Sequence, residues 1–210
     1  MMGQLYERAL AGERCWVRHR HGEVRSLPVE RWLGGSRADA VFDRAVLEMC
    51  VGPVIDVGCG PGRLVAQLAK QGVCALGVDQ SASAIELARR SGAPAVLCDI
   101  FTALPGIGRW RTALLIDGNI GIGGDPHRLL ERVYRLLSTG GRCIVEFDTC
   151  LTGVRTAPVR LESADQVGPW FRWATVGLDS ADQLARECGF EVGRICAVGD
   201  RVVVSLERAG

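Results

Sequence analysis

The feature that most constrains the fold is a short apolar run that leads into a glycine-rich turn. Residues 53–57 read Pro-Val-Ile-Asp-Val, and the turn Gly-Cys-Gly-Pro-Gly follows at residues 58–62. Residues 62–71 then carry apolar side chains at helical spacing, and Gly72 is expected to end that helix. A buried strand, a glycine turn and a helix in this order are typical of an α/β fold that binds ligands at the carboxyl ends of parallel strands.

The rest of the chain continues this alternation. Apolar runs of strand length recur at residues 73–78, 95–98, 112–116 and 141–147, with helical patterns at 81–90 and 126–137 between them. Continuous apolar strands separated by helices favour a parallel sheet that helices cover on both faces. Near the end, a helix at 180–188 precedes two strand patterns, which Gly199-Asp200 joins as a hairpin. The last strand, at 201–206, is therefore predicted to run antiparallel.

The domain organisation follows from the same pattern. The first 37 residues have weak periodicity and lie outside the repeating unit. We expect residues 1–37 to form a cover or lid segment, and residues 38–210 to form a single domain. A chain of 210 residues is long enough for one domain with its own core.

The composition disfavours several classes of protein. A formal net charge of +1 gives no general attraction to nucleic acid or to an anionic membrane. No stretch reaches the roughly 20 apolar residues of a membrane span, and the start does not read as a signal peptide, so we expect a cytoplasmic protein. The nine cysteines form no C-x-x-C pair, and we predict no metal site. A monomer or a homodimer is expected.

The glycine turn has a competing interpretation as the dinucleotide fingerprint G-x-G-x-x-G. Counted from Gly58, the third glycine of that fingerprint falls on Arg63, where close packing of helix on strand leaves no room for a side chain. Asp56 would also be unfavourable beside a pyrophosphate, whereas it suits a cationic ligand. An NAD(P)-binding oxidoreductase and a non-catalytic cofactor-binding module remain the alternatives to a transferase.

The D-x-G-x-G-x-G pattern of residues 56–62 resembles the first motif of the class I S-adenosylmethionine-dependent methyltransferases of small molecules. The resemblance extends motif by motif from about residue 42 to residue 147. It implies S-adenosylmethionine as cofactor and methyl transfer to a small-molecule acceptor at an oxygen, nitrogen or carbon position. It also implies a Rossmann-like, doubly wound, mostly parallel sheet of seven strands in the order 3-2-1-4-5-7-6, with the last strand antiparallel.

The resemblance also implies where the cofactor binds. Asp56 would help hold its amino group, Asp79 would accept hydrogen bonds from the ribose hydroxyls, and Asp99 would contact the adenine. The full set of implied cofactor-binding residues is Asp56, Gly58, Gly60, Gly62, Asp79, Gln80, Asp99, Ile100, Asp117, Gly118 and Asn119. Acidic residues thus follow four successive strands at one edge of the predicted sheet.

The acceptor site is less defined by the sequence. The Asn/Asp-Pro-Pro-Tyr motif of nucleic-acid and protein-amide methyltransferases is absent after the fourth strand, where a glycine-containing loop stands at residues 117–126. This favours a small-molecule acceptor and no nucleic-acid partner. Four aromatic residues are candidates to line its pocket: Tyr6, Trp32, Trp170 and Trp173.

No catalytic residue is assigned with certainty, because a sulfonium donor is already activated and methyl transfer depends mainly on positioning. His127 is a weak candidate for a general base, although a surface position is favoured for it. His19 and His21 lie in a basic stretch with Arg14 and Arg25, which we interpret as a solvated edge rather than an anion site.

Overall fold

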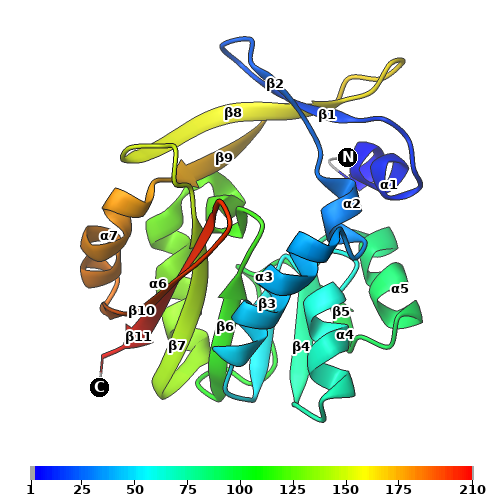
Figure 1. The fold of residues 1–210 in the computed structure, drawn as a ribbon. Coiled ribbons are helices and arrows are strands. Elements are labelled where there is room, and N and C mark those ends of the chain that lie inside the picture. The colour runs from blue at the N-terminus through cyan, green and yellow to red at the C-terminus, as the bar shows by residue number, and fades with distance from the viewer. Residues whose placement is uncertain (1–2, 210) are drawn as a thin grey trace.

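The structure is a computed structural model that describes residues 3–209 and contains two β-sheets (Figure 1). The larger sheet has seven strands in the order β10-β11-β7-β6-β3-β4-β5. Its strands are β3 (Val54–Val57), β4 (Ala75–Asp79), β5 (Ala95–Leu97), β6 (Trp110–Leu115), β7 (Leu137–Phe147), β10 (Phe190–Val198) and β11 (Arg201–Arg208).

The larger sheet confirms the predicted fold class. Numbered 1 to 7 along the chain, its strands stand in the order 3-2-1-4-5-7-6. Strands β3 to β7 pair in parallel, whereas β11 is antiparallel to both β7 and β10. Residues 199–200 form the predicted turn between β10 and β11.

Helices cover both faces of this sheet, as the continuous apolar strands predicted. On one face, α3 (Arg37–Glu48), α4 (Arg63–Lys70) and α5 (Ala82–Arg90) pack on residues such as Val54 and Leu114. On the other, α6 (Pro126–Leu136) and α7 (Ala181–Glu187) pack on Ile55 and Leu115. Alternate strand residues thus enter two separate apolar cores. No helix among the described residues has the length and apolar character needed to cross a membrane.

Helix starts follow the capping signals in the sequence. The Ser81 side chain accepts a hydrogen bond from the Ala84 backbone at the start of α5. Asp125 likewise accepts from the backbone of Arg128, and Pro126 is the first residue of α6. Ser36 forms a capping box with Asp39 and starts α3.

The smaller sheet was not predicted. It has four strands in the order β2-β1-β8-β9, namely β1 (Trp16–His19), β2 (Val24–Ser26), β8 (Val154–Glu162) and β9 (Phe171–Val176). Its strands come from both the N-terminal segment and the stretch between β7 and α7. The cover therefore extends beyond residues 1–37 and includes residues 154–176.

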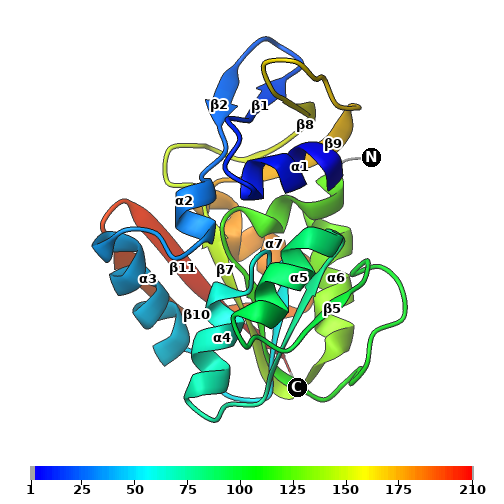
Figure 2. The ribbon, with the colours of Figure 1, turned by 90° about the vertical axis from the view of Figure 1, so that its right-hand side faces the viewer.

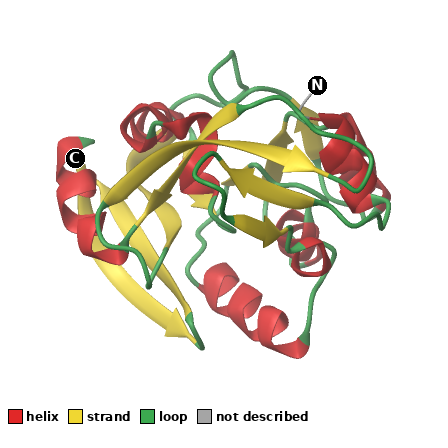
Figure 3. Ribbon diagram, turned by 90° about the horizontal axis from the view of Figure 1, so that it is seen from above, coloured by secondary structure: helices red, strands yellow, loops and turns green. Residues whose placement is uncertain are grey.

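This smaller sheet lies above the larger one on the side where α1 (Gly3–Leu10) and α2 (Val29–Trp32) are found (Figures 1 and 2). Viewed from above, its strands cross over the top of the molecule (Figure 3). Leu5 and Ala9 of α1 and Cys15 form its small apolar core, against which Leu161 of β8 packs. We call α1, α2 and the four strands the cap.

Candidate functional site

The glycine turn between β3 and α4 has left-handed backbone at Gly58, Gly60 and Gly62, with φ angles of 73°, 53° and 76°. A Cβ atom on Gly58 would lie 2.7 Å from Nδ2 of Asn119, and one on Gly62 would lie 2.8 Å from Cβ of Ala88. Because Gly58 and Gly62 have no side chain, Asn119 and Ala88 can pack directly against the backbone of the turn. Gly60 differs, because only the Tyr6 hydroxyl would lie near its Cβ, at 3.0 Å.

Asp79, at the end of β4, is tied to the glycine turn. Its Oδ2 accepts a hydrogen bond from the Gly60 backbone at 2.9 Å, and its Oδ1 accepts one from Ser81 at 2.8 Å. Burial raises the pKa of this carboxyl group. Each carboxylate oxygen has two lone pairs, so Asp79 can still accept hydrogen bonds from a ligand.

Asp99 and its neighbours lie at the edge of the sheet beyond β5. Asp99 Oδ1 accepts from the backbone of Phe101 at 2.9 Å, and Gln80 after β4 is exposed. The side chain of Ile100 is 3% exposed and packs in the core, while its carbonyl accepts from Arg132. Any contact of Ile100 with a ligand would therefore be limited to atoms that the core leaves accessible.

Asp56 in β3 is a buried carboxylate, with 4% of its surface exposed. No side-chain hydrogen bond reaches it from the described residues. Burial is the main cause that raises its pKa to about 7, and Arg63 partly opposes that shift. A buried carboxylate without a partner favours a cation beside it.

The cap brings Tyr6 and Trp32 to the glycine turn. Their rings lie 5.4 Å apart between α1 and α2. The Tyr6 hydroxyl approaches Gly60, and its pKa is raised by burial and by the neighbouring Asp79. Both residues were predicted as acceptor-lining, but the structure places Tyr6 against the turn predicted to bind the cofactor.

Asp117 ends β6 within a buried set of charges that the sequence did not reveal. Its Oδ2 accepts from Nη1 of Arg63 at 2.6 Å, and its Oδ1 accepts from Nη2 of Arg201 at 2.7 Å. Arg63 also bonds to Asp43 of α3, and Arg201 to Glu146 of β7. Arg63 stands where a dinucleotide fingerprint has its third glycine. In this chain, the arginine at that position forms buried ion pairs with Asp117 and Asp43.

Gly118 and Asn119 connect Asp117 to the glycine turn. Gly118 has a φ of 80° and precedes the short 3-10 segment η1 (Asn119–Gly124). Asn119 Nδ2 donates to the carbonyl oxygens of Val57 and Gly58, both at 2.9 Å. The amide of Asn119 thus acts here on the backbone that forms the turn.

Of the two tryptophans near β9, the structure brings Trp173 to the glycine-containing loop. A Cβ on Gly121 of η1 would lie 2.5 Å from the Trp173 ring nitrogen, so the ring packs closely on that glycine. Phe171 and Trp173 share a face of β9, with ring centroids 6.3 Å apart. Trp170 is 44% exposed and stacks under the guanidinium of Arg160.

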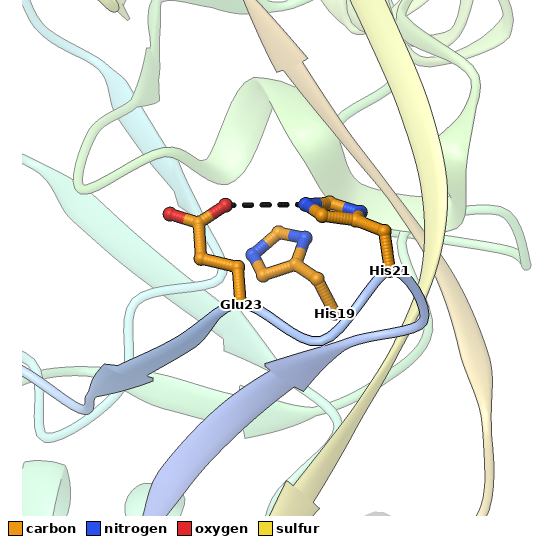
Figure 4. Close-up of side chains that lie close together, drawn as sticks. All are labelled: His19, His21 and Glu23. Carbon is orange, nitrogen blue, oxygen red and sulfur yellow. Dashed lines mark hydrogen bonds and ion pairs between the residues drawn. The ribbon is translucent and has the colours of Figure 1, made fainter.

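The three histidines make their contacts elsewhere than at the glycine turn. His127 bonds to Glu187 of α7 at 2.6 Å, and about half of each side chain is exposed, which supports the surface interpretation. His19, His21 and Glu23 meet at the β1–β2 turn (Figure 4), where one ligand atom from each lies within 4.8 Å of the others. The Glu23 carboxylate is paired with Arg25 at 2.6 Å, and this positive charge opposes a metal ion there.

Comparison with known proteins shows which fold the chain has and which domain its central part resembles. Residues 54–141, which include the glycine turn, Asp79 and Asp117, match the model of a family described as a methyltransferase domain. This stretch of the chain is a methyltransferase domain. The resemblance inferred from residues 56–62 is thereby confirmed. No curated protein matches the chain.

Solved structures of methyltransferases share the fold of this enzyme. One from Bacteroides fragilis, in complex with S-adenosyl-L-homocysteine, has 19% identity and a TM-score of 0.79, covering 100% of this chain and 94% of that one. A possible histamine N-methyltransferase from Thermotoga maritima has 18% identity and a TM-score of 0.66, covering 99% and 100%. A 1,6-didemethyltoxoflavin-N1-methyltransferase from Burkholderia thailandensis has 21% identity and a TM-score of 0.58, covering 80% and 77%.

Proposed function

We propose that this methyltransferase takes its methyl group from S-adenosylmethionine and transfers it to a small-molecule acceptor held between the glycine turn and the cap. The observation that carries the proposal is the isolated carboxylate of Asp56 beneath a turn of left-handed glycines. The donor has an ammonium group and a sulfonium centre, so it supplies the positive charge that Asp56 lacks. Structures of the same fold from Bacteroides fragilis and Burkholderia thailandensis contain S-adenosylhomocysteine.

The residues at the carboxyl ends of the strands fit this donor. Asp56 would bind the ammonium group, and the remaining lone pairs of Asp79 would accept the ribose hydroxyls. Tyr6 would close the site above Gly60, where its hydroxyl can reach a polar ligand group. Asp99 would accept a hydrogen bond from the adenine amino group. When bound, the donor supplies an electrophilic methyl group on sulfur.

The acceptor would lie against η1 and Trp173. The η1 segment begins beside the glycine turn at Asn119 and contacts β9 of the cap at Gly121. Proteins of similar fold act on small molecules, as the names of a 1,6-didemethyltoxoflavin-N1-methyltransferase and a sugar N-methyltransferase state. In this chain, η1 and the cap would align the nucleophile with the methyl group and exclude water, which accounts for much of the rate in such a reaction. A cytoplasmic location and a monomeric or homodimeric state stay predictions.

The test is calorimetric titration of the purified protein with S-adenosylmethionine and S-adenosylhomocysteine, with NADH and NADPH as comparators. We expect the sulfur ligands to bind and the dinucleotides not to bind. Asp56→Asn keeps the size of the side chain but removes its charge, and should weaken binding on the order of tenfold or more. Because burial raises the Asp56 pKa to about 7, wild-type affinity should fall as the pH drops below that value.

The matched control is Asp182→Asn, which removes an exposed carboxylate paired with Arg186 on α7. It should bind both sulfur ligands like the wild type. Absence of binding by the wild type, or a preference for NADH, would refute the proposal. Binding without turnover across a panel of acceptors would instead favour a non-catalytic module.

A further inference from the structure

Two buried arginines hold Asp117 from opposite sides. Arg63 is the first residue of α4, and Arg201 begins β11, and their side chains are 11% and 8% exposed. Each donates to a different oxygen of Asp117, at 2.6 and 2.7 Å. Both oxygens of Asp117 thus have a charged protein partner, which fixes the orientation of this carboxylate.

The backbone of Asp117 requires this support. Among the described residues, it alone has a positive φ without being glycine, at 57°. A left-handed backbone is unfavourable for a non-glycine residue, and surrounding contacts must maintain it. The Asp117 N–H donates to Oε2 of Glu146 at 2.6 Å, and Arg201 holds both oxygens of Glu146.

The turn that Asp117 makes decides where Asn119 lies. Asn119 follows two residues later and bonds to the carbonyl oxygens of Val57 and Gly58. A chain of direct contacts thus runs from Arg201 through Asp117 and Asn119 to the glycine turn. None of these contacts needs a bound ligand.

We propose that Arg63 and Arg201 are positioning residues that preset the glycine turn for the methyl donor by fixing Asp117 and, through it, Asn119. This inference rests on the proposed function, because it concerns affinity for the same donor. The proposal also explains why this chain has an arginine where dinucleotide-binding turns need glycine: Arg63 holds Asp117.

The charges around the two arginines make the proposal testable. Asp43 bonds to Arg63 at 3.0 Å, Asp39 lies 3.8 Å from Arg201, and the Phe42 ring covers Arg201 at 3.4 Å. Together with Asp117 and Glu146, this places four carboxylates around two guanidinium groups. Asp56 and the Tyr6 hydroxyl also lie near this set: burial is the main cause that raises their pKa values, and Asp79 and Asp117 add to the shift. Removing one guanidinium leaves neighbouring carboxylates that repel each other until one takes up a proton.

The experiment measures S-adenosylhomocysteine binding by calorimetry from pH 6 to pH 9, together with the thermal unfolding midpoint. Arg201→Met should weaken binding on the order of tenfold at pH 8, because Asp117 and Glu146 then lose their shared partner. The ratio of variant to wild-type Kd should shrink as the pH falls, since protonation relieves the repulsion. Guanidinium chloride at non-denaturing concentration should restore part of the affinity by filling the vacated site.

Two further variants keep the test decisive. Arg201→Lys preserves the charge but cannot bond to Asp117 and Glu146 in the same fork geometry, so it should fold and bind with intermediate affinity. Arg208→Met is the matched control, because Arg208 lies at the far end of β11 and packs on Tyr134, away from the glycine turn. It should lower the unfolding midpoint without changing the Kd.

Three outcomes would overturn the proposal: wild-type affinity in both Arg201 variants, a loss of affinity that is equal at every pH, or no rescue by guanidinium. If the wild type itself does not bind S-adenosylhomocysteine, the proposed function fails instead. The two failures are therefore distinguishable within one set of titrations.

Discussion

Glu162 is the residue on which the assembly of the cap should depend most. It lies at the end of β8, and its side chain is 6% exposed. Its carboxylate accepts hydrogen bonds from Trp16 and Arg18 of β1, both at 2.8 Å, and from Arg160 at 2.7 Å. A single carboxylate thus joins the N-terminal strand of the cap to the strand from the second half of the chain.

The contribution of Glu162 to folding stability follows from the shift of its pKa. The three donors, with the Arg18 hydrogen bond the largest influence, lower the pKa of Glu162 from an ordinary 4.5 to about 2. Such a difference corresponds to about 3 kcal/mol of folding stability at neutral pH. Because the pKa is lowered in the folded state, this contribution is complete above pH 4.5 and is lost as the pH falls toward 2.

The perturbation is Glu162→Gln, which keeps the shape of the side chain and removes its charge. We expect urea unfolding at pH 7 to show a free energy about 2–3 kcal/mol below that of the wild type, since Arg18 and Arg160 stay partly solvated. The difference should narrow at pH 3, where wild-type Glu162 begins to protonate. Glu23→Gln, which removes an exposed partner of Arg25, serves as the control and should change far less. A penalty for Glu162→Gln that is below about 1 kcal/mol, or that does not depend on pH, would refute the reasoning.

Two further predictions concern the turn and the histidine. Gly62→Ala should destabilise the protein by about 2–4 kcal/mol, because it combines a left-handed backbone with a Cβ 2.8 Å from that of Ala88. Gly72→Ala has a similar φ of 75° with open space around it, so it should cost only about 1 kcal/mol, and equal losses in denaturant unfolding would contradict this account. His127→Ala should leave donor affinity and the pH profile of methyl transfer unchanged, because its side chain pairs with Glu187 on the surface. A loss of turnover between pH 6 and 9 at unchanged donor affinity would restore His127 as a candidate base.

The larger sheet could be predicted because its central strands are short, mainly apolar runs. Residues 54–57 and 112–116 are buried on both faces, and such runs identify central parallel strands from the sequence alone. The glycine turn was also identifiable from the sequence, because an apolar strand precedes it and a helical pattern follows it. Strand order, by contrast, came from the family resemblance.

The smaller sheet was not predicted because the sequences of its strands lack a clear strand pattern. Strand β8 contains Pro158, and proline disfavours a central strand because it has no N–H to donate. The register explains why it is tolerated: β1 ends at His19, opposite Val159, so no strand residue faces Pro158 on that side. Arg20 then donates to the Pro158 carbonyl from the turn.

The ionic network around Asp117 was also beyond the sequence pattern. Arg63 and Arg201 are 138 positions apart, and nothing in their local context marks them as partners of one carboxylate. The available signal was the failure of the dinucleotide fingerprint at position 63. An arginine at a site where many turns require glycine indicates that the charge has a partner, but it does not say which one.

The η1 segment links the two halves of the proposed active site. At its start, Asn119 holds the backbone of the glycine turn, and at its end the Gly124 carbonyl accepts a hydrogen bond from Thr156 of the cap at 3.1 Å. Between them, Gly121 receives the ring of Trp173. Any displacement of the cap that moves Trp173 or Thr156 must therefore move η1, and η1 cannot move far without releasing Asn119 from Gly58. Direct contacts of η1 therefore connect the cap to the glycine turn.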